Sequence, residues 1–342
     1  MQKKLFFTFG GILLILLWIQ GLAQAAPSFF EGKTVRIIVG YSAGGGFDIN
    51  SRIIARHIGK YLPGRPTVIV ENMTGAGGLI LANHLYKVAK PDGLTIGHFI
   101  GYLVFNQVLG EPGIEFDAGK FVYLGAAMQE HAVIALSKAS GITTVDKWLT
   151  AKTPVKLGGV APGNSVDNNT RIIKAALGLP IQLVSGYKGT SDIRLAVENG
   201  ELAGVAYGWD SMKSSWQKAI ERGDIVPVVQ AAAQPFPDIP KVPLAISYAK
   251  NDEARKLIEI GLHSSSIFSR PFALPPGTPK DRVQILRKAF QDTMKDKEFL
   301  AEMAKANMGL EPVTGEELEK HILGVYKLEP AFLAKLKTIM FK

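Results

Sequence analysis

The sequence contains no cysteine among its 342 residues. This absence excludes disulfide bonds, thiolate-ligated metal sites, cysteine nucleophiles and a lipoprotein anchored through an N-terminal cysteine. Two further motifs are missing, the H-E-x-x-H pattern of zinc enzymes and the G-x-x-x-x-G-K-[ST] phosphate loop. The glycine-rich segments also fail the dinucleotide-binding pattern. We therefore expect no metal and no cofactor.

Runs of basic residues are also missing, although the formal net charge is +9. The lysines and arginines are scattered and do not alternate with aromatic residues in the way that is typical of nucleic-acid-binding surfaces. We therefore expect no nucleic-acid partner. A mildly basic surface of this kind favours the approach of a small anion.

Only one hydrophobic run is long, and it stands at the N-terminus. Two lysines precede the uncharged segment 5–19, and small residues at A-x-A spacing follow at 23–25. This order is typical of a secretory signal peptide. We predict that residues 1–25 are cleaved after Ala25 and that the mature protein is periplasmic. An uncleaved membrane anchor is the alternative, because about 20 apolar residues can span a bilayer.

What the sequence does contain is a regular alternation of strand and helix patterns. Strand patterns at 35–41, 67–71 and 94–99 alternate with helix patterns at 49–62 and 79–89. The alternation restarts with strands at 155–160, 181–185, 202–207 and 225–230 and helices at 166–177, 191–199 and 212–222. A proline-rich passage then leads to helices at 252–262 and 280–294. The pattern predicts an α/β protein whose sheets are mainly parallel and flanked by helices.

The restart of the pattern predicts two lobes with a ligand cleft between them. The segments DINSRIIARHIG (48–59) and DNNTRIIKAALG (167–178) are similar, and each follows a strand and a glycine-containing loop. Chance similarity of two amphipathic helices explains the shared letters equally well. Each half nevertheless presents a loop and a helix N-terminus. We assign residues 26–125 plus 232–342 to lobe 1 and residues 126–231 to lobe 2, with two chain crossings as the hinge.

Two glycine-rich loops follow neighbouring strands of lobe 1. Three consecutive glycines in YSAGGGFD (41–48) expose backbone N–H groups at a helix start, which carries a partial positive charge. ENMTGAGG (71–78) has the same character, and the ends of adjacent parallel strands lie side by side. The aspartate of the first loop also suits the role of helix N-cap. The candidate ligand-binding residues are Tyr41, Ser42, Gly44, Gly45, Gly46, Asp48, Asn72, Thr74, Gly75, Ala76 and Gly77.

Three segments of lobe 2 offer matching candidates, namely APGNS (161–165), SGYKGTSD (185–192) and AYGWD (206–210). Hydroxyl groups at helix starts serve as caps or as ligand donors. The aromatic residues suit either a pocket wall or a core or hinge position. The candidate residues are Gly163, Asn164, Ser165, Tyr187, Gly189, Thr190, Trp209 and Asp210.

No catalytic set is visible. GNSVD (163–167) has aspartate where a nucleophile elbow requires glycine, and none of the six histidines stands in a recognisable catalytic setting. We therefore expect a binding protein and no enzyme. Two alternatives stay open, a sensor that presents its ligand to a membrane signalling protein and an exported α/β hydrolase.

The order YSAGGGFD, ENMTGAGG, AKPDGLTIG, APGNS, GYKG, WD and PPGTPKD resembles that of the periplasmic solute-binding receptors of tripartite tricarboxylate transporters, also called the Bug family. The resemblance covers nearly the whole mature chain. It implies a type II-like two-lobed periplasmic-binding-protein fold. It also implies a monomer that binds a small organic anion, a mono- or dicarboxylate, and delivers it to membrane permease subunits.

The resemblance also implies how the ligand is held. Segments 41–48 and 72–78 match those that bind a carboxylate through backbone amides and waters, and 163–165, 187–190 and Asp210 match those that complete the pocket. The sequence departs from the family where Ser42 and Thr74 replace a frequent proline and where Trp209 replaces a frequent phenylalanine. Backbone binding tolerates such changes, whereas the identity of the ligand depends on the variable positions.

Overall fold

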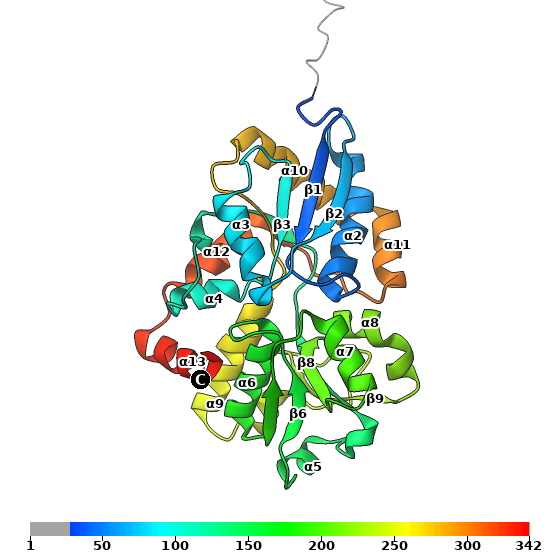
Figure 1. Cartoon of the computed structure of the whole chain (residues 1–342), viewed down its shortest axis with the longest axis vertical. Coiled ribbons are helices and arrows are strands. Elements are labelled where there is room, and N and C mark those ends of the chain that lie inside the picture. Colours follow the sequence, from blue (N-terminus) through cyan, green and yellow to red (C-terminus); the bar gives the residue numbers. More distant parts are fainter. Residues whose placement is uncertain (1–27, 342) are drawn as a thin grey trace, which may run out of the picture.

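The structure is a computed structural model that describes residues 28–341, and the predicted signal peptide lies outside these residues. Two β-sheets, each covered by helices, form two lobes stacked along the long axis of the molecule (Figure 1). We call the lobe that contains strand β1 lobe 1 and the other lobe 2. The predicted two-lobed α/β architecture is confirmed. Between residues 28 and 341, no helix has both the length and the apolar composition needed to cross a bilayer.

The sheet of lobe 1 has the strand order β11-β4-β10-β3-β1-β2. Its strands are β1 (Thr34–Val39), β2 (Thr67–Asn72), β3 (Thr95–His98), β4 (Val122–Ala126), β10 (Phe272–Leu274) and β11 (Val313–Thr314). The helices of this part of the chain are α2 (Gly46–Ile58), α3 (Leu79–Lys87), α4 (Leu103–Val108), α10 (Lys280–Thr293), α11 (Lys297–Lys305) and α12 (Gly315–Val325). Strand β1 pairs in parallel with β2 and β3, so the loops that follow β1 and β2 lie at the same edge.

The sheet of lobe 2 has the strand order β7-β6-β8-β5-β9. Its strands are β5 (Ala132–Ser137), β6 (Val155–Gly158), β7 (Ile181–Val184), β8 (Gly204–Gly208) and β9 (Ile225–Ala231). Its helices are α5 (Val145–Leu149), α6 (Ser165–Leu177), α7 (Thr190–Glu198) and α8 (Trp209–Glu221). The helices that follow β6, β7 and β8 begin at the side of the sheet that faces lobe 1 (Figure 1).

The expectation of mainly parallel sheets needs correction, because both sheets are mixed. Strand β10 runs antiparallel to β3 and β4, and β11 runs antiparallel to β4. In the second sheet, β5 runs antiparallel to its neighbours β8 and β9. The cause of the error is physical: a short strand that is buried on both faces has the same continuous apolar pattern in either direction.

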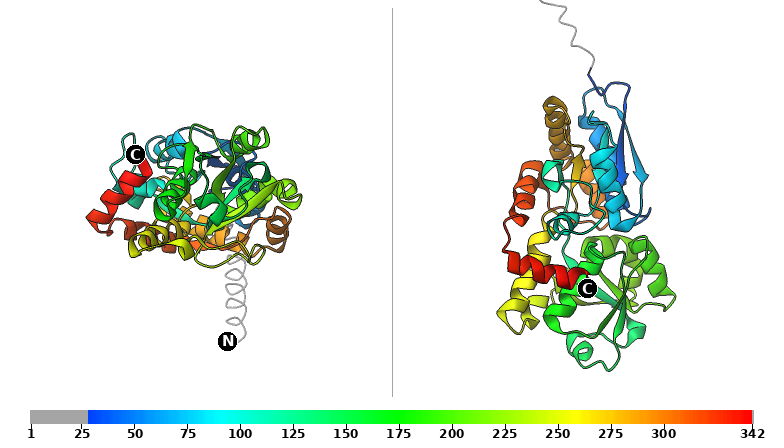
Figure 2. Two further views of the ribbon diagram at one scale, coloured as in Figure 1. Left: turned by 90° about the horizontal axis from the view of Figure 1, so that it is seen from below. Right: turned by 60° about the vertical axis from the view of Figure 1, so that its left-hand side comes forward.

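The predicted assignment of every residue after 231 to lobe 1 also needs correction. Helix α9 (Asp252–Ile258), the π-helical segment Glu259–Ser264 and helix α13 (Pro330–Phe341) pack against α6 of lobe 2. Figure 2 shows the C-terminal helix beside lobe 2. Three side chains of α13, those of Phe332, Leu336 and Met340, are buried in the same apolar cluster as Ile172 and Ile173 of α6. Burial of this apolar stripe holds the C-terminal helix on lobe 2.

His98 ends strand β3 inside the core of lobe 1. Its side chain is fully buried, its Nδ1 lies 2.7 Å from Ser51 Oγ, and its ring stacks on Phe272 with a centroid separation of 4.0 Å. Burial and the nearby positive charge of Arg270 hold the pKa of His98 well below its usual value. The imidazole is therefore neutral in the folded protein at neutral pH.

This buried imidazole makes stability depend on pH. Below about pH 6.5 the unfolded chain takes up a proton at residue 98 that the folded chain does not bind. The free energy of unfolding should therefore fall as the pH decreases from 7.5 to 5.5, and this one residue should contribute up to ~1.4 kcal/mol per pH unit at the acidic end. Urea unfolding at several pH values measures this slope.

His98→Gln should show a smaller slope, because glutamine does not titrate and still offers a hydrogen bond to Ser51. Replacing the exposed His321 by glutamine is the matched control and should leave the slope unchanged. Equal slopes for the wild-type protein and His98→Gln would contradict this assignment.

Candidate functional site

An enclosed cavity lies between the lobes, and residues of both lobes line it. Its volume is about 20 Å³, which is enough for a single water molecule but too small for an organic acid. The structure therefore represents a closed conformation. The lining residues are Tyr41, Gly46, Phe47, Glu130, Val160, Asn164, Ser165, Val166, Thr190, Tyr207, Ser211 and Arg270.

Helix N-termini from both lobes meet at this cavity. Helices α2 and α7 begin after Gly45 and Gly189, and neither N-cap has a side chain that accepts a hydrogen bond from the first turn. The first N–H groups of a helix have no partner within the helix, and each N-terminus acts as about half a positive charge. These two uncapped ends therefore supply donors and positive potential to an anion between the lobes.

Two further helices of lobe 2, α6 and α8, also begin at the side that faces lobe 1. Asn164 caps α6 by accepting a hydrogen bond from the N–H of Val166 at 3.0 Å. Gly208 is the N-cap of α8, and its N–H donates to Glu130 Oε1 at 3.0 Å. Helix α8, like α2 and α7, therefore has no side-chain cap for the N–H groups of its first turn, whereas α6 is capped.

Asp48 holds the first glycine-rich loop in place through hydrogen bonds. It is the third residue of α2, and it accepts hydrogen bonds at 2.9 Å from the N–H of Gly44, from Arg52 Nε and from Asn72 Nδ2. Burial alone raises the pKa of the Asp48 carboxyl, but these hydrogen bonds outweigh burial and leave the pKa below its usual value. The N-cap of α2 is Gly45, so the expected N-cap role of Asp48 is wrong. Asp48 and Asn72 instead stabilise the conformation of the loop through hydrogen bonds.

Asp167 occupies the equivalent position in lobe 2. It is the third residue of α6, it is fully buried, and it accepts hydrogen bonds from the N–H groups of Val160 at 2.6 Å and Ala161 at 3.1 Å. The similarity between segments 48–59 and 167–178 therefore has a structural basis: in each lobe an aspartate one turn into the helix holds the preceding loop.

The second glycine-rich loop is a strained turn that is also held from lobe 2, because Asn164 Nδ2 donates to the Gly77 carbonyl at 3.2 Å across the cleft. Gly75, Gly77 and Gly78 have positive φ, and so does Ala76 at 45°, which is uncommon for a residue with a Cβ atom. Burial raises the pKa of the Tyr41 phenol far above its usual value, so its hydroxyl keeps its proton and donates to the Gly77 carbonyl at 3.0 Å. Thr74 and Ala76 are exposed, whereas Gly77 is buried.

Direct contacts between the lobes depend on glycines. Ser42 Oγ lies 2.9 Å from Ser191 Oγ, and a Cβ atom on Gly189 would lie only 2.4 Å from Ser42 Oγ. A Cβ atom on Gly46 would lie 2.2 Å from Ser211 Oγ. Asn164 Nδ2 also donates to Tyr41 Oη at 2.7 Å across the cleft. The two lobes therefore approach each other this closely only because residues 46 and 189 have no side chain.

The predicted site residues divide into three groups. Tyr41, Gly46, Asn164, Ser165 and Thr190 line the cavity. Residues in the two loops of lobe 1, namely Ser42, Gly44, Gly45, Asp48, Asn72, Thr74, Gly75, Ala76 and Gly77, belong to the loop structure around it, as does Gly189 of lobe 2. The remaining four predicted residues have their contacts elsewhere.

Those four residues do not line the closed cavity, and their role in ligand binding stays a prediction. Gly163 lies against Asn106 and Phe341, which are contributed by α4 and α13. Tyr187 donates its hydroxyl to Glu201 at 2.6 Å. The Trp209 indole donates to Asp238, and Asp210 lies 3.0 Å from Lys213. Local sequence does not reveal partners of this kind, because for three of the four residues the partner lies 14 or more residues away along the chain.

The two charged residues of the cavity, Arg270 and Glu130, were not among the predicted site residues. Arg270 is 1% exposed, its Nε donates to Glu130 Oε2 at 3.0 Å, and its Nη2 donates to Ser211 Oγ at 2.5 Å. Its guanidinium carbon also lies 4.2 Å from the centroid of the Phe47 ring. In the sequence, Arg270 is distinguished only as the single charged residue of the stretch 264–279, which has no periodic pattern.

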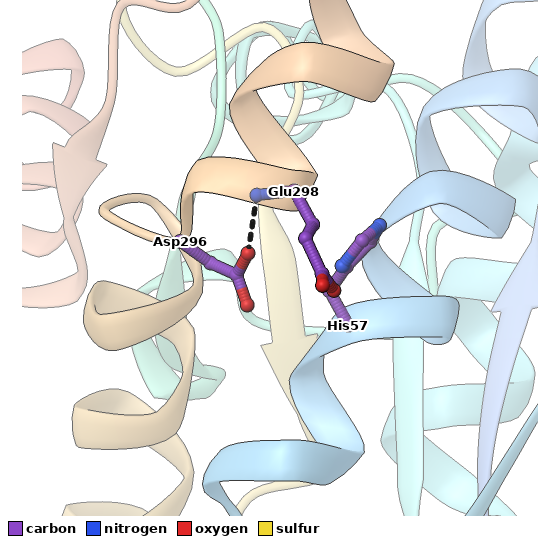
Figure 3. Close-up of side chains that lie close together, drawn as sticks. All are labelled: His57, Asp296 and Glu298. Carbon is purple, nitrogen blue, oxygen red and sulfur yellow. Dashed lines mark hydrogen bonds between the residues drawn. The ribbon is translucent and has the colours of Figure 1, made fainter.

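A cluster of metal-ligand type lies away from the cavity. His57, Asp296 and Glu298 place their potential ligand atoms within 4.8 Å of one another (Figure 3). The ammonium group of Lys60 contacts His57 Nδ1 at 3.0 Å, Asp296 at 3.1 Å and Glu298 at 2.5 Å. Asp296 also caps α11, accepting from the N–H of Glu298 at 2.7 Å. The ammonium group of Lys60 therefore already supplies a positive charge to this cluster. The cluster links α2 to α11.

Comparisons with known proteins place this geometry in context. The family model described as "Tripartite tricarboxylate transporter family receptor" matches residues 51–323. The "UPF0065 protein in gbd 5′ region" of Cupriavidus necator is 28% identical over 320 residues, which are 92% of this chain and 90% of that protein.

Solved structures share the fold. The R. palustris protein Rpa4515 with adipate has a TM-score of 0.73 and 18% identity, with coverage of 91% of this chain and 99% of that chain. MatC from Rhodopseudomonas palustris with bound malate has a TM-score of 0.71 and 17% identity, with coverage of 90% and 99%.

The contact between Gly46 and Ser211 predicts that a methyl group at position 46 prevents closure. Gly46→Ala should give a larger radius of gyration than the wild-type protein in small-angle X-ray scattering without ligand. The secondary structure should be unchanged, because alanine is favoured over glycine in a helix by about 0.5–1 kcal/mol.

Gly324→Ala is the matched control, because a Cβ atom on this other helical glycine would meet nothing within 4 Å. Adding Ser211→Gly to Gly46→Ala should restore the compact form by removing the atoms that clash. A compact Gly46→Ala single variant would show that this contact does not limit closure.

Proposed function

The chain belongs to the family of receptors of tripartite tricarboxylate transporters, and on this basis we propose that it is a periplasmic receptor for a small mono- or dicarboxylate. It would deliver this anion to the membrane permease subunits of a tripartite transporter. The observation that carries the proposal is the closed cavity between the lobes, where the uncapped N-termini of α2 and α7 meet. Backbone N–H groups at helix N-termini bind anionic oxygens and do not bind cations.

The energetics of such a site support useful affinity. A hydrogen bond to a charged group contributes roughly 1.5–3 kcal/mol net. Three or four such bonds, less the cost of ordering the loops and closing the lobes, allow micromolar binding at about −8 kcal/mol. The hydrocarbon part of a ligand finds apolar surface on Phe47, Val160 and Val166, which also line the cavity.

Binding requires the lobes to separate, because the closed cavity has room for only one water molecule. The two connections between the sheets, after β4 and before β10, are the natural hinge. A ligand that contacts both lobes stabilises a closed or partly closed state over the open one. Permease subunits that recognise this state would distinguish loaded from empty receptor.

Ligands of the related structures support the carboxylate class, since adipate and malate are the molecules named with the two Rhodopseudomonas proteins. We propose binding without turnover. Among residues 28–341, the serine–histidine hydrogen bond between Ser51 and His98 joins two fully buried side chains that do not line the cavity. This pair therefore gives no support to the hydrolase alternative.

A thermal-shift screen tests the proposal on the mature protein. Adipate, malate, shorter monocarboxylates and citrate form the panel, and their neutral amides are the matched controls. A ligand present at 100 times its dissociation constant should stabilise the protein by ~2.7 kcal/mol, which raises its melting temperature. Failure of every carboxylate to raise the melting temperature, or stabilisation by the amides to the same degree, would overturn the proposal.

A further inference from the structure

Arg270 places a full positive charge at the base of the cleft. It stands two residues before β10, in the connection that returns the chain to lobe 1, and Glu130 stands in the opposite connection between β4 and β5. Both side chains are almost completely buried. A buried guanidinium needs partners for its N–H groups, since each unpaired donor costs free energy.

One part of this guanidinium has no protein partner. Nε is bonded to Glu130 and Nη2 to Ser211, but Nη1 is buried and has no hydrogen-bond partner among the residues that the structure describes. Arg270 lines the cavity together with Gly46 at the start of α2. The residue that carries the unpaired donor and the uncapped start of α2 therefore line the same enclosed space.

Glu130 orients the guanidinium and leaves Nη1 free. Its Oε1 accepts from the N–H of Gly208 and its Oε2 accepts from Arg270 Nε, both at 3.0 Å. Ser211 holds Nη2 from lobe 2, and the Phe47 ring covers the guanidinium face from lobe 1. Neighbours fixed on these sides hold the guanidinium in one orientation before a ligand arrives.

We propose that Arg270 is the residue that makes this receptor specific for a charged carboxylate, with Nη1 donating to an anionic oxygen of the ligand. This inference rests on the proposed function and extends it, because backbone amides alone accept neutral oxygens as well as charged ones. A guanidinium favours a carboxylate strongly over the amide of the same shape. The ligand is therefore a carboxylate that binds in its ionised form, held by a side-chain charge in addition to helix N-termini.

The experiment compares one carboxylate with its amide in two proteins by calorimetry. The carboxylate is the strongest ligand of the panel above, and the amide is its isosteric derivative. The variant carries Glu130→Gln and Arg270→Gln together, so that no buried charge is left unpaired. We expect it to bind the carboxylate about 10- to 100-fold more weakly than the wild-type protein, as the loss of one charge-assisted hydrogen bond predicts.

The preference for carboxylate over amide is the decisive readout, because a purely structural role of Arg270 would not change it. Glu130→Gln alone separates the two changes: it retains the guanidinium of Arg270 and should therefore discriminate carboxylate from amide more strongly than the double variant does. If the double glutamine variant does not fold, Glu130→Leu with Arg270→Met provides an apolar pair of similar size for the same measurement.

An unchanged preference in the double variant would overturn the role of Arg270 and leave the receptor function standing. A wild-type protein that binds no carboxylate would overturn both proposals. The two failures are therefore distinguishable.

Discussion

Hydrogen-bond donors without protein acceptors remain among the residues that surround the space between the two lobes, and the proposed binding of an anion depends on these donors. The N-termini of α2 and α7 have no side-chain caps, and Arg270 keeps one buried N–H group unpaired. Folding leaves such groups unsatisfied only at a cost. An anionic oxygen that accepts hydrogen bonds from these groups removes that cost. A carboxylate ligand therefore accounts for the donors that lack protein partners in the cleft.

The backbone around the cleft is arranged to keep those donors accessible. Glycine at 45, 46 and 189 allows close approach of the lobes, while Asp48 and Asp167 hold the two loops from behind. The same contacts that position the donors also close the cleft almost completely. Ligand capture and lobe movement are therefore one process in this fold, because the site is formed by two bodies and neither body holds it alone.

Most of the local secondary structure and the glycine-rich loops could be predicted from the sequence. Alternating strand and helix patterns identified β1 to β3, β6 to β9 and most helices, and glycine-rich turns identified where α2 and α7 begin. Strand direction was not predictable, because buried strands have the same apolar pattern in parallel and antiparallel sheets. Long-range contacts were also hidden, so the packing of α13 on lobe 2 and the pair of Arg270 with Glu130, 140 residues apart, emerged only from the structure.

A crystal structure of the mature protein with a bound carboxylate tests the central claim most directly. The account predicts the carboxylate oxygens between the starts of α2 and α7 and the guanidinium of Arg270, with the lobes farther apart than in the closed form described here. A carboxylate bound outside the cleft, or one held in the cleft without contact to either helix start or to Arg270, would contradict it.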